Sequence, residues 1–289
     1  MASLLVGDGL IFPEGPRWHD GALFLSDQHA HKVLRITLDG DVTTLAEFGD
    51  MPSGLGFLPD GSLLVALMRS AHVRRLDLTS LRHELYSDLS ATGTRCLIND
   101  MVVDQEGRAY VGCRSGQYAH PPEGSGWITR VDPDGSPSIA ATDLMGPNGM
   151  IVSNGALLVA ETWESRITQF DIGPHGVLGS RRAFAVLPDG LRPDGICLDR
   201  EGSVWTGAIG AWIRVSGDGA ITERIAPAPG FSAVACVHGG GQRELLFLVS
   251  SAFKREGLRA LAQGRRDSES GSVGRVEFVS VATSGAGIP

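Results

Sequence analysis

Cysteine, basic charge and long apolar runs are all scarce in this chain of 289 residues. The four cysteines stand far apart, with no C-x-x-C pair, at Cys96, Cys113, Cys197 and Cys236. That spacing does not support a zinc ribbon or a thioredoxin-like redox site, and it favours cysteines that fill the core. A formal net charge of −8 leaves no basic footprint for nucleic acid.

Membrane and export signals are also missing. No apolar run reaches the length of about 18 residues that a membrane span needs. The segment Met1–Asp8 has neither the basic flank nor the apolar length of a signal peptide. We therefore expect a cytoplasmic protein with neither a membrane nor a nucleic acid as partner.

What the chain does have is an internal repeat. Six segments each begin with a small oxygen-bearing residue just before an apolar run, at Glu14, Ser53, Asn99, Asn148, Asp194 and Ser232. The steps between these positions are 39, 46, 49, 46 and 38 residues, a period typical of propellers and solenoids. In five repeats a Gly after Asp, Glu or Asn separates the first apolar run from the second. This pattern predicts that each repeat opens with a β-hairpin.

The strand count predicts how the ring closes. A third strand follows the hairpin in every repeat and a fourth follows in the first five, whereas the sixth repeat ends before its fourth strand. Residues 3–8 supply the missing strand, because they precede Glu14 as residues 44–50 precede Ser53. We predict a single all-β domain over residues 1–289. It is a six-bladed β-propeller with four-stranded blades, closed by the N-terminal strand pairing into the C-terminal blade.

The repeated positions predict a metal site at one mouth of the channel. The first strand of each blade lines the channel, so the six side chains should converge there. Glu14 and Asp194 are carboxylates, and Asn99 and Asn148 are amides, a set of hard oxygen donors that suits Ca²⁺, Mg²⁺ or Mn²⁺. Two carboxylates in a dry channel repel each other unless a cation neutralises them. Turn chemistry alone is the alternative, but it predicts the same residue in most blades.

Four motifs at blade spacing then resemble a known family. They are Glu14-Gly15-Pro16-Arg17-Trp18, Asn99-Asp100-Met101-Val102-Val103-Asp104, Gly146-Pro147-Asn148-Gly149-Met150 and Arg192-Pro193-Asp194-Gly195-Ile196-Cys197-Leu198-Asp199. Together they resemble the senescence marker protein, gluconolactonase and luciferin-regenerating-enzyme family over essentially the whole chain. The resemblance implies a metal-dependent lactonase. It implies that Glu14, Asn148 and Asp194 hold the metal and that Asp194 is the general base. It also implies that Asn99 contacts metal-bound water or substrate. Ca²⁺ is the first expectation, with Mn²⁺, Mg²⁺, Zn²⁺ or Fe²⁺ as alternatives.

One position departs from the sugar lactonases of that family. An arginine that binds substrate hydroxyls there corresponds to Leu97 here. Replacing a guanidinium by an isobutyl group favours a lactone less polar than gluconolactone. The loops between the second and third strands share the predicted mouth, and they offer further candidate substrate contacts at Tyr118, His120, Glu161, Trp163 and Trp212. His29 and His31 lack a third ligand, so we do not interpret them as a metal site.

The predicted chemistry is hydrolysis of a cyclic ester. The cation would stabilise the oxyanion that develops on the carbonyl oxygen, while Asp194 accepts a proton from the attacking water. A metal-bound water as nucleophile is the second version of the same step. Phosphotriester hydrolysis, an isomerase or cyclase reaction on the same ion, and a ligand-binding propeller without catalysis stay open. The loop 250–272 is expected to be a lid, a partner surface or an unstructured segment, and the oligomeric state is open.

Overall fold

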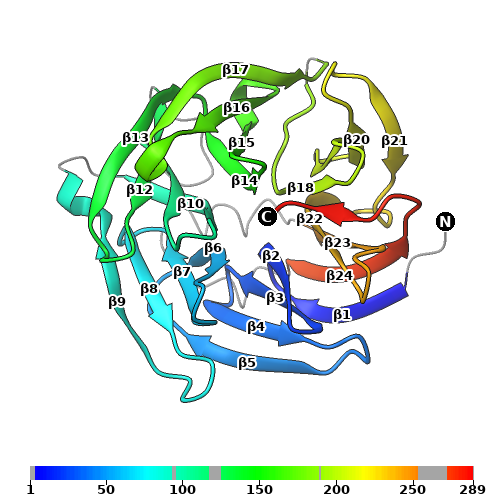
Figure 1. Cartoon of the computed structure of the whole chain (residues 1–289). Helices are drawn as coiled ribbons and strands as arrows, with labels where there is room; N and C mark the ends of the chain where they lie inside the picture. Colours follow the sequence, from blue (N-terminus) through cyan, green and yellow to red (C-terminus); the bar gives the residue numbers. More distant parts are fainter. Residues whose placement is uncertain (1–3, 93–95, 117–124, 189, 253–271, 289) are drawn as a thin grey trace.

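The computed structural model describes residues 4–92, 96–116, 125–188, 190–252 and 272–288. Six antiparallel sheets are arranged around a common axis, with one strand of each sheet facing the centre (Figure 1). The chain is therefore an all-β six-bladed propeller, as the repeat predicted. No helix among these residues is long and apolar enough to cross a membrane.

Each of the first three blades runs from an inner strand to an outer strand in chain order. Blade 1 contains β2 (Pro13–His19), β3 (Ala22–Asp27), β4 (Lys32–Ile36) and β5 (Val42–Glu47). Blade 2 contains β6 (Pro52–Phe57), β7 (Leu63–Leu67), β8 (His72–Leu76) and β9 (His83–Asp88). Blade 3 contains β10 (Leu97–Val103), β11 (Ala109–Arg114), β12 (Gly126–Val131) and β13 (Pro137–Leu144).

Blade 4 follows the same order, whereas blades 5 and 6 each include a strand from one end of the chain. Blade 4 contains β14 (Pro147–Ser153), β15 (Ala156–Glu161), β16 (Arg166–Ile172) and β17 (Leu178–Val186). Blade 5 contains β18 (Ile196–Asp199), β19 (Val204–Gly207), β20 (Trp212–Val215), β21 (Ile221–Ile225) and β25 (Gly285–Ala286). Blade 6 contains β22 (Ser232–Gly239), β23 (Leu245–Ala252), β24 (Val273–Ser280) and β1 (Leu4–Leu10). Short 3₁₀ turns occupy Leu89–Thr92, Thr162–Glu164 and Pro174–Gly176.

The two chain ends are both held by backbone pairing. β1 pairs antiparallel with β24, from Leu4 opposite Phe278 to Leu10 opposite Gly274, which confirms the predicted closure of the ring. The C-terminal segment forms a further strand that was not predicted. β25 pairs with the inner strand β18, so blade 5 has five strands rather than four. β25 contains two small residues and pairs through its backbone. It has no apolar alternation that would mark a strand in the sequence.

The inner strands of neighbouring blades lie very close together, because small residues follow the repeated polar positions. A Cβ atom added at Gly54 would lie 2.3 Å from the backbone nitrogen of Met101 on the next blade. A Cβ at Gly195 would lie 2.3 Å from the Cβ of Ala235. Side chains larger than hydrogen would therefore force the blades apart at these two positions. This close approach brings the preceding polar residues together at the channel.

Candidate functional site

A line of hydrogen bonds joins the polar positions of three consecutive blades. The Ser53 hydroxyl donates to Oδ1 of Asn99 at 3.0 Å. Nδ2 of Asn99 in turn donates to Oδ1 of Asn148 at 3.0 Å. The Gln28 amide donates to the Ser53 hydroxyl at 3.3 Å. The predicted convergence of these side chains from blades 2, 3 and 4 is therefore present in the structure.

The orientation of the Asn148 amide follows from its second partner. The Thr162 hydroxyl donates its proton to the carbonyl oxygen of Pro193 at 2.8 Å. It must therefore accept the hydrogen bond from Nδ2 of Asn148, at 3.1 Å. This arrangement places the Asn148 oxygen on the side of the ring, where a hard cation would bind it. Thr162 was not singled out in the sequence, because its role depends on a loop lying beside a neighbouring blade.

Two carboxylates share the ring with these amides. Burial raises the pKa of Glu14 well above its ordinary value, and the charges of Asp194 and Asp100 raise it further. The pKa of Asp194 rises to about 7 through burial and the charge of Asp100, opposed by a hydrogen bond from Asn148. Asp194 is partly exposed to solvent. The ring thus holds two carboxylates that favour a proton or a cation at neutral pH.

The donors present fit a hard divalent cation. Two carboxylates and one oriented amide oxygen are ligands that Ca²⁺, Mg²⁺ and Mn²⁺ prefer. No group of three His, Cys, Asp or Glu side chains that could hold a metal occurs among the residues that the structure describes. A cation at this ring therefore depends on the Asn148 oxygen as well as on Glu14 and Asp194.

Two charged residues of the channel were missed as site residues in the sequence. Asp100 directly follows Asn99 at a position that is Gly or Ala in the other five repeats. Arg17 lies on β2, and its Nη2 donates to the carbonyl of Met101 at 2.5 Å. Both side chains are buried. The single charged residue in a series of small ones was the sequence signal for Asp100.

Two of the expected substrate contacts, Leu97 and Trp163, are partly exposed in the structure. Leu97 packs against the buried side chains of Met51 and Met68, and this apolar cluster adjoins Asn99. Trp163 is partly exposed, and the guanidinium of Arg192 lies over its ring at 4.2 Å from the centroid. The surroundings of Leu97 are therefore apolar, and those of Trp163 are aromatic and cationic.

Two other expected contacts have structural partners instead. Glu161 is fully buried, and its carboxylate accepts hydrogen bonds from Arg166 at 2.8 Å and from the backbone of Met145 at 2.8 Å. Trp212 is also buried, and its Nε1 donates to the carbonyl of Ala235 at 2.9 Å. These contacts give both side chains partners within the protein, and their role as substrate contacts stays a prediction.

The remaining predicted contacts lie outside the described residues. They are Tyr118 and His120, together with residues 253–271 of the long loop. The histidine next to the first blade can be placed. His29 is buried, its ring stacks on Phe12 with centroids 4.5 Å apart, and burial lowers its pKa to about 3.

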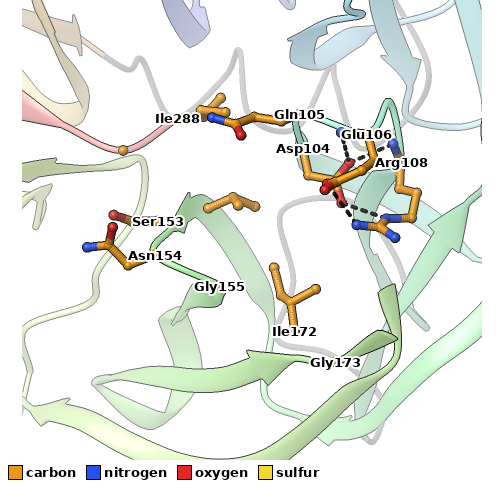
Figure 2. A pocket seen from close by; sticks show the side chains of 12 residues that line it. Asp104, Gln105, Glu106, Arg108, Ser153, Asn154, Gly155, Ile172, Gly173 and Ile288 are labelled. Carbon is orange, nitrogen blue, oxygen red and sulfur yellow. Dashed lines mark hydrogen bonds and ion pairs between the residues drawn. The ribbon is translucent and has the colours of Figure 1, made fainter. Parts of the chain in front are cut away.

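A separate cavity lies at the opposite end of the channel. It has a volume of about 530 Å³ and lies between the turns of blades 3 and 4 and the C-terminal segment (Figure 2). The carboxylate of Asp104 on its wall accepts hydrogen bonds from the backbone and from Nε of Arg108, at 2.7 Å for the latter. The charged groups of this cavity pair with each other. The cavity therefore differs from the ring, whose carboxylates favour a proton or a cation.

The sequence of this chain is similar to those of known proteins. The family model described as the SMP-30/gluconolactonase/LRE-like region matches residues 12–252. A pentonolactonase of Haloferax volcanii is 26% identical over 200 residues, which are 67% of this chain and 65% of that protein. The match thus spans less than two thirds of the curated relative's length.

Solved structures show the same architecture. A gluconolactonase from Xanthomonas campestris aligns with a TM-score of 0.74 at 25% identity, covering 96% of this chain and 89% of that one. A calcium-binding protein, regucalcin, from Agrobacterium tumefaciens aligns with a TM-score of 0.79 at 19% identity, covering 100% and 96%. A luciferin-regenerating enzyme aligns with a TM-score of 0.78 at 17% identity, covering 99% and 98%.

The fold and the ring thus define a six-bladed propeller with a polar channel mouth. The chain belongs to the SMP-30/gluconolactonase/LRE-like family, as the four motifs indicated. Named relatives in this family are lactonases, and one structural neighbour is a calcium-binding protein.

Proposed function

We propose that this protein is a metal-dependent lactonase whose substrate is less polar than gluconolactone. One observation carries the proposal. The charge of Asp194 raises the pKa of the buried Glu14 carboxylate, and the oriented oxygen of Asn148 belongs to the same ring. Such a set favours a divalent cation over two protons at neutral pH. The lactonases among the family relatives support the reaction class.

Glu14, Asn148 and Asp194 would hold the cation, with Ca²⁺ as the first candidate. When bound, a divalent cation supplies an electrophile for the lactone carbonyl oxygen and lowers the pKa of water in its neighbourhood. Asp194 would accept a proton from the attacking water; in the metal-free protein burial and the charge of Asp100 raise its pKa to about 7. Asn99 has its oxygen occupied by Ser53 and one amide proton by Asn148. Its second amide proton is the group that can orient a water or a substrate oxygen.

The apolar side chain of Leu97 supports the proposed substrate class. Leu97 is partly exposed next to Asn99, and the buried side chains of Met51 and Met68 pack behind it. Apolar side chains cannot hydrogen-bond sugar hydroxyls, and a hydroxyl buried against them would lose its contacts with water. Aliphatic or aryl lactones avoid that cost.

An acid-release assay tests the proposal. A pH indicator follows aliphatic, aryl and sugar lactones with Ca²⁺ or Mn²⁺ present and after treatment with a chelator. We expect acid release that is fastest with an apolar lactone and is lost on chelation. Activity that survives complete metal removal would refute the metal-dependent mechanism. Binding of lactones without acid release would instead support a ligand-binding propeller, and turnover without acid release would support an isomerase or cyclase.

A further inference from the structure

Below the ring, Arg17 and Asp100 place two more charges in the channel. Arg17 follows Glu14 on β2, where the pairing with β3 contains a bulge between these two residues. Asp100 follows Asn99 on β10, where a second bulge lies between Ile98 and Met101. An irregular strand turns neighbouring side chains away from the strict alternation of a ladder. Both charged residues are thereby buried next to ring residues instead of facing solvent.

Backbone groups fix the guanidinium of Arg17. Its Nη1 donates to the carbonyl of Pro16 at 2.8 Å, and its Nη2 donates to the carbonyl of Met101 at 2.5 Å. These two neutral acceptors bind the guanidinium without cancelling its charge. Nε of Arg17 has no hydrogen-bond partner among the described residues. The fold therefore holds a full positive charge in the channel.

Asp100 is the complementary observation. Its side chain is 3% exposed, and its Oδ1 has no hydrogen-bond partner within the described part of the chain. The charge of Asp100 raises the pKa of both Glu14 and Asp194. Burial raises the pKa of Asp100 itself, and the positive charge of Arg17 opposes that rise. A buried, unsatisfied carboxylate is costly unless something charged or polar compensates it. Asp100 thus acts on the ring through its charge, although it lies one residue beyond Asn99 in the sequence.

We propose that Arg17 and Asp100 set the charge of the channel so that it selects a divalent cation. Glu14, Asp194 and Asp100 carry three negative charges when ionised, and Arg17 carries one positive charge, which leaves a net charge of about −2. This inference rests on the proposed metal site and assigns a role to two residues that do not themselves hold the metal. Removing either residue changes the charge by one unit in opposite directions.

The charge change predicts a change in cation preference. Asp100→Asn leaves about one net negative charge and weakens Ca²⁺ binding by about tenfold or more. Arg17→Met leaves about three negative charges and shifts the preference towards a trivalent ion such as Tb³⁺. The double variant Arg17→Met with Asp100→Asn restores the original sum, so its preference returns towards that of the unmodified protein. A role in shape alone predicts additive losses instead.

Calorimetric titration with Ca²⁺ and with Tb³⁺ tests the four proteins without using activity. Arg214→Met with Asp199→Asn, a buried charge pair at the other end of β18, is the matched control, and we expect its Ca²⁺ affinity to be unchanged. Circular dichroism checks that each variant is folded. If Arg17→Met does not fold, Asp100→Asn and the double variant still decide the result.

The outcomes separate the two proposals. An unmodified protein that binds neither ion refutes the proposed metal site and the inference with it. Ca²⁺ binding that is normal in the unmodified protein and unchanged in Asp100→Asn overturns the charge assignment and leaves the proposed function standing. Recovery of the divalent preference in the double variant supports the assignment.

Discussion

The two ends of the channel use the same residue types in opposite ways. At the end of β18, Asp199 accepts hydrogen bonds from the backbone nitrogens of Glu201 and Ser203, and its second oxygen accepts one from Arg214 at 2.7 Å. At the start of the same blade, Asp194 has a raised pKa and lies in the field of Asp100. One carboxylate is satisfied by its own hairpin, and the other requires a proton or a cation.

The difference teaches how to separate structural acids from functional ones. Asp104 in blade 3 repeats the arrangement of Asp199, with two backbone donors and Arg108 as partners. All of these partners lie within the same blade, so the arrangement stabilises the turn locally. Among the ring acids, Glu14 accepts a long local hydrogen bond from the backbone of Gly15, at 3.4 Å, and Asp194 accepts one from Asn148 on another blade. Carboxylates that the local chain leaves unsatisfied are the ones that can bind a ligand.

The largest expected effect is on turnover. Asp194→Asn removes the proton acceptor and one metal ligand, and we expect kcat/KM for a lactone substrate to fall by about 10²–10⁴-fold. Asp199→Asn is the same chemical change at the other end of the strand. Below its unfolding temperature it should keep near-normal kcat/KM. Equal losses in the two variants would contradict the contrast between the two ends.

The same two substitutions should change stability in opposite directions: Asp199→Asn should destabilise the protein, and Asp194→Asn should stabilise it without metal. Asp199→Asn leaves the buried guanidinium of Arg214 with a weaker partner, and we expect it to lower the free energy of unfolding by about 2–4 kcal/mol. Asp194→Asn removes a carboxylate that repels its neighbours, so it should stabilise the metal-free protein at pH 8. Urea unfolding in the presence of a chelator measures both changes. A loss of stability in Asp194→Asn would count against repulsion in the ring.

The pH dependence of the metal-free protein follows from the raised pKa of Asp194. The folded state keeps a proton that the unfolded state has lost, so this group's contribution to stability is complete below the unfolded pKa. It is lost as pH rises through about 7. We expect the difference in unfolding free energy between unmodified protein and Asp194→Asn to change by roughly 1–3 kcal/mol between pH 4 and pH 8. A difference that stays constant with pH would show an unperturbed Asp194.

Removing the C-terminal segment tests whether the far end only supports the fold. Deletion of residues 284–289 removes β25 and the paired backbone hydrogen bonds between Val152 and Ile288, each 2.8 Å long. We expect a loss of about 1–3 kcal/mol in unfolding free energy, because each backbone hydrogen bond contributes roughly 1 kcal/mol net. The affinity for Ca²⁺ should stay the same. A fall in that affinity would mean that the two ends are coupled.

The smallest effect concerns substrate choice. Leu97→Arg adds hydrogen-bond donors beside Asn99 and interrupts the contact with Met51 and Met68. We expect the ratio of kcat/KM for a sugar lactone to that for an aliphatic lactone to rise by about tenfold. Leu97→Met is the control, since it keeps an apolar side chain of similar volume. An unchanged ratio would remove Leu97 from the substrate wall.

Repetition made much of this predictable. The hairpin turns recur because the left-handed backbone needs glycine there, for example at Gly21 with a φ of 75°. Strand order and ring closure follow from the count of apolar runs, as the pairing of β1 with β24 confirms. The convergence of Ser53, Asn99 and Asn148 follows from their equivalent positions in successive blades. The burial of Glu161 and Trp212 could not be predicted, because it depends on how neighbouring strands and blades pack.

The sequence by itself determined the propeller, its closure and the ring of polar positions, because each depends on a pattern that repeats along the chain. Only the tertiary structure decided which acids are satisfied, that Thr162 orients Asn148, and that Arg17 reaches the carbonyl of Met101. Those facts depend on contacts between blades. The position of one blade against another sets burial and hydrogen-bond partners, and no local pattern in either blade encodes that position.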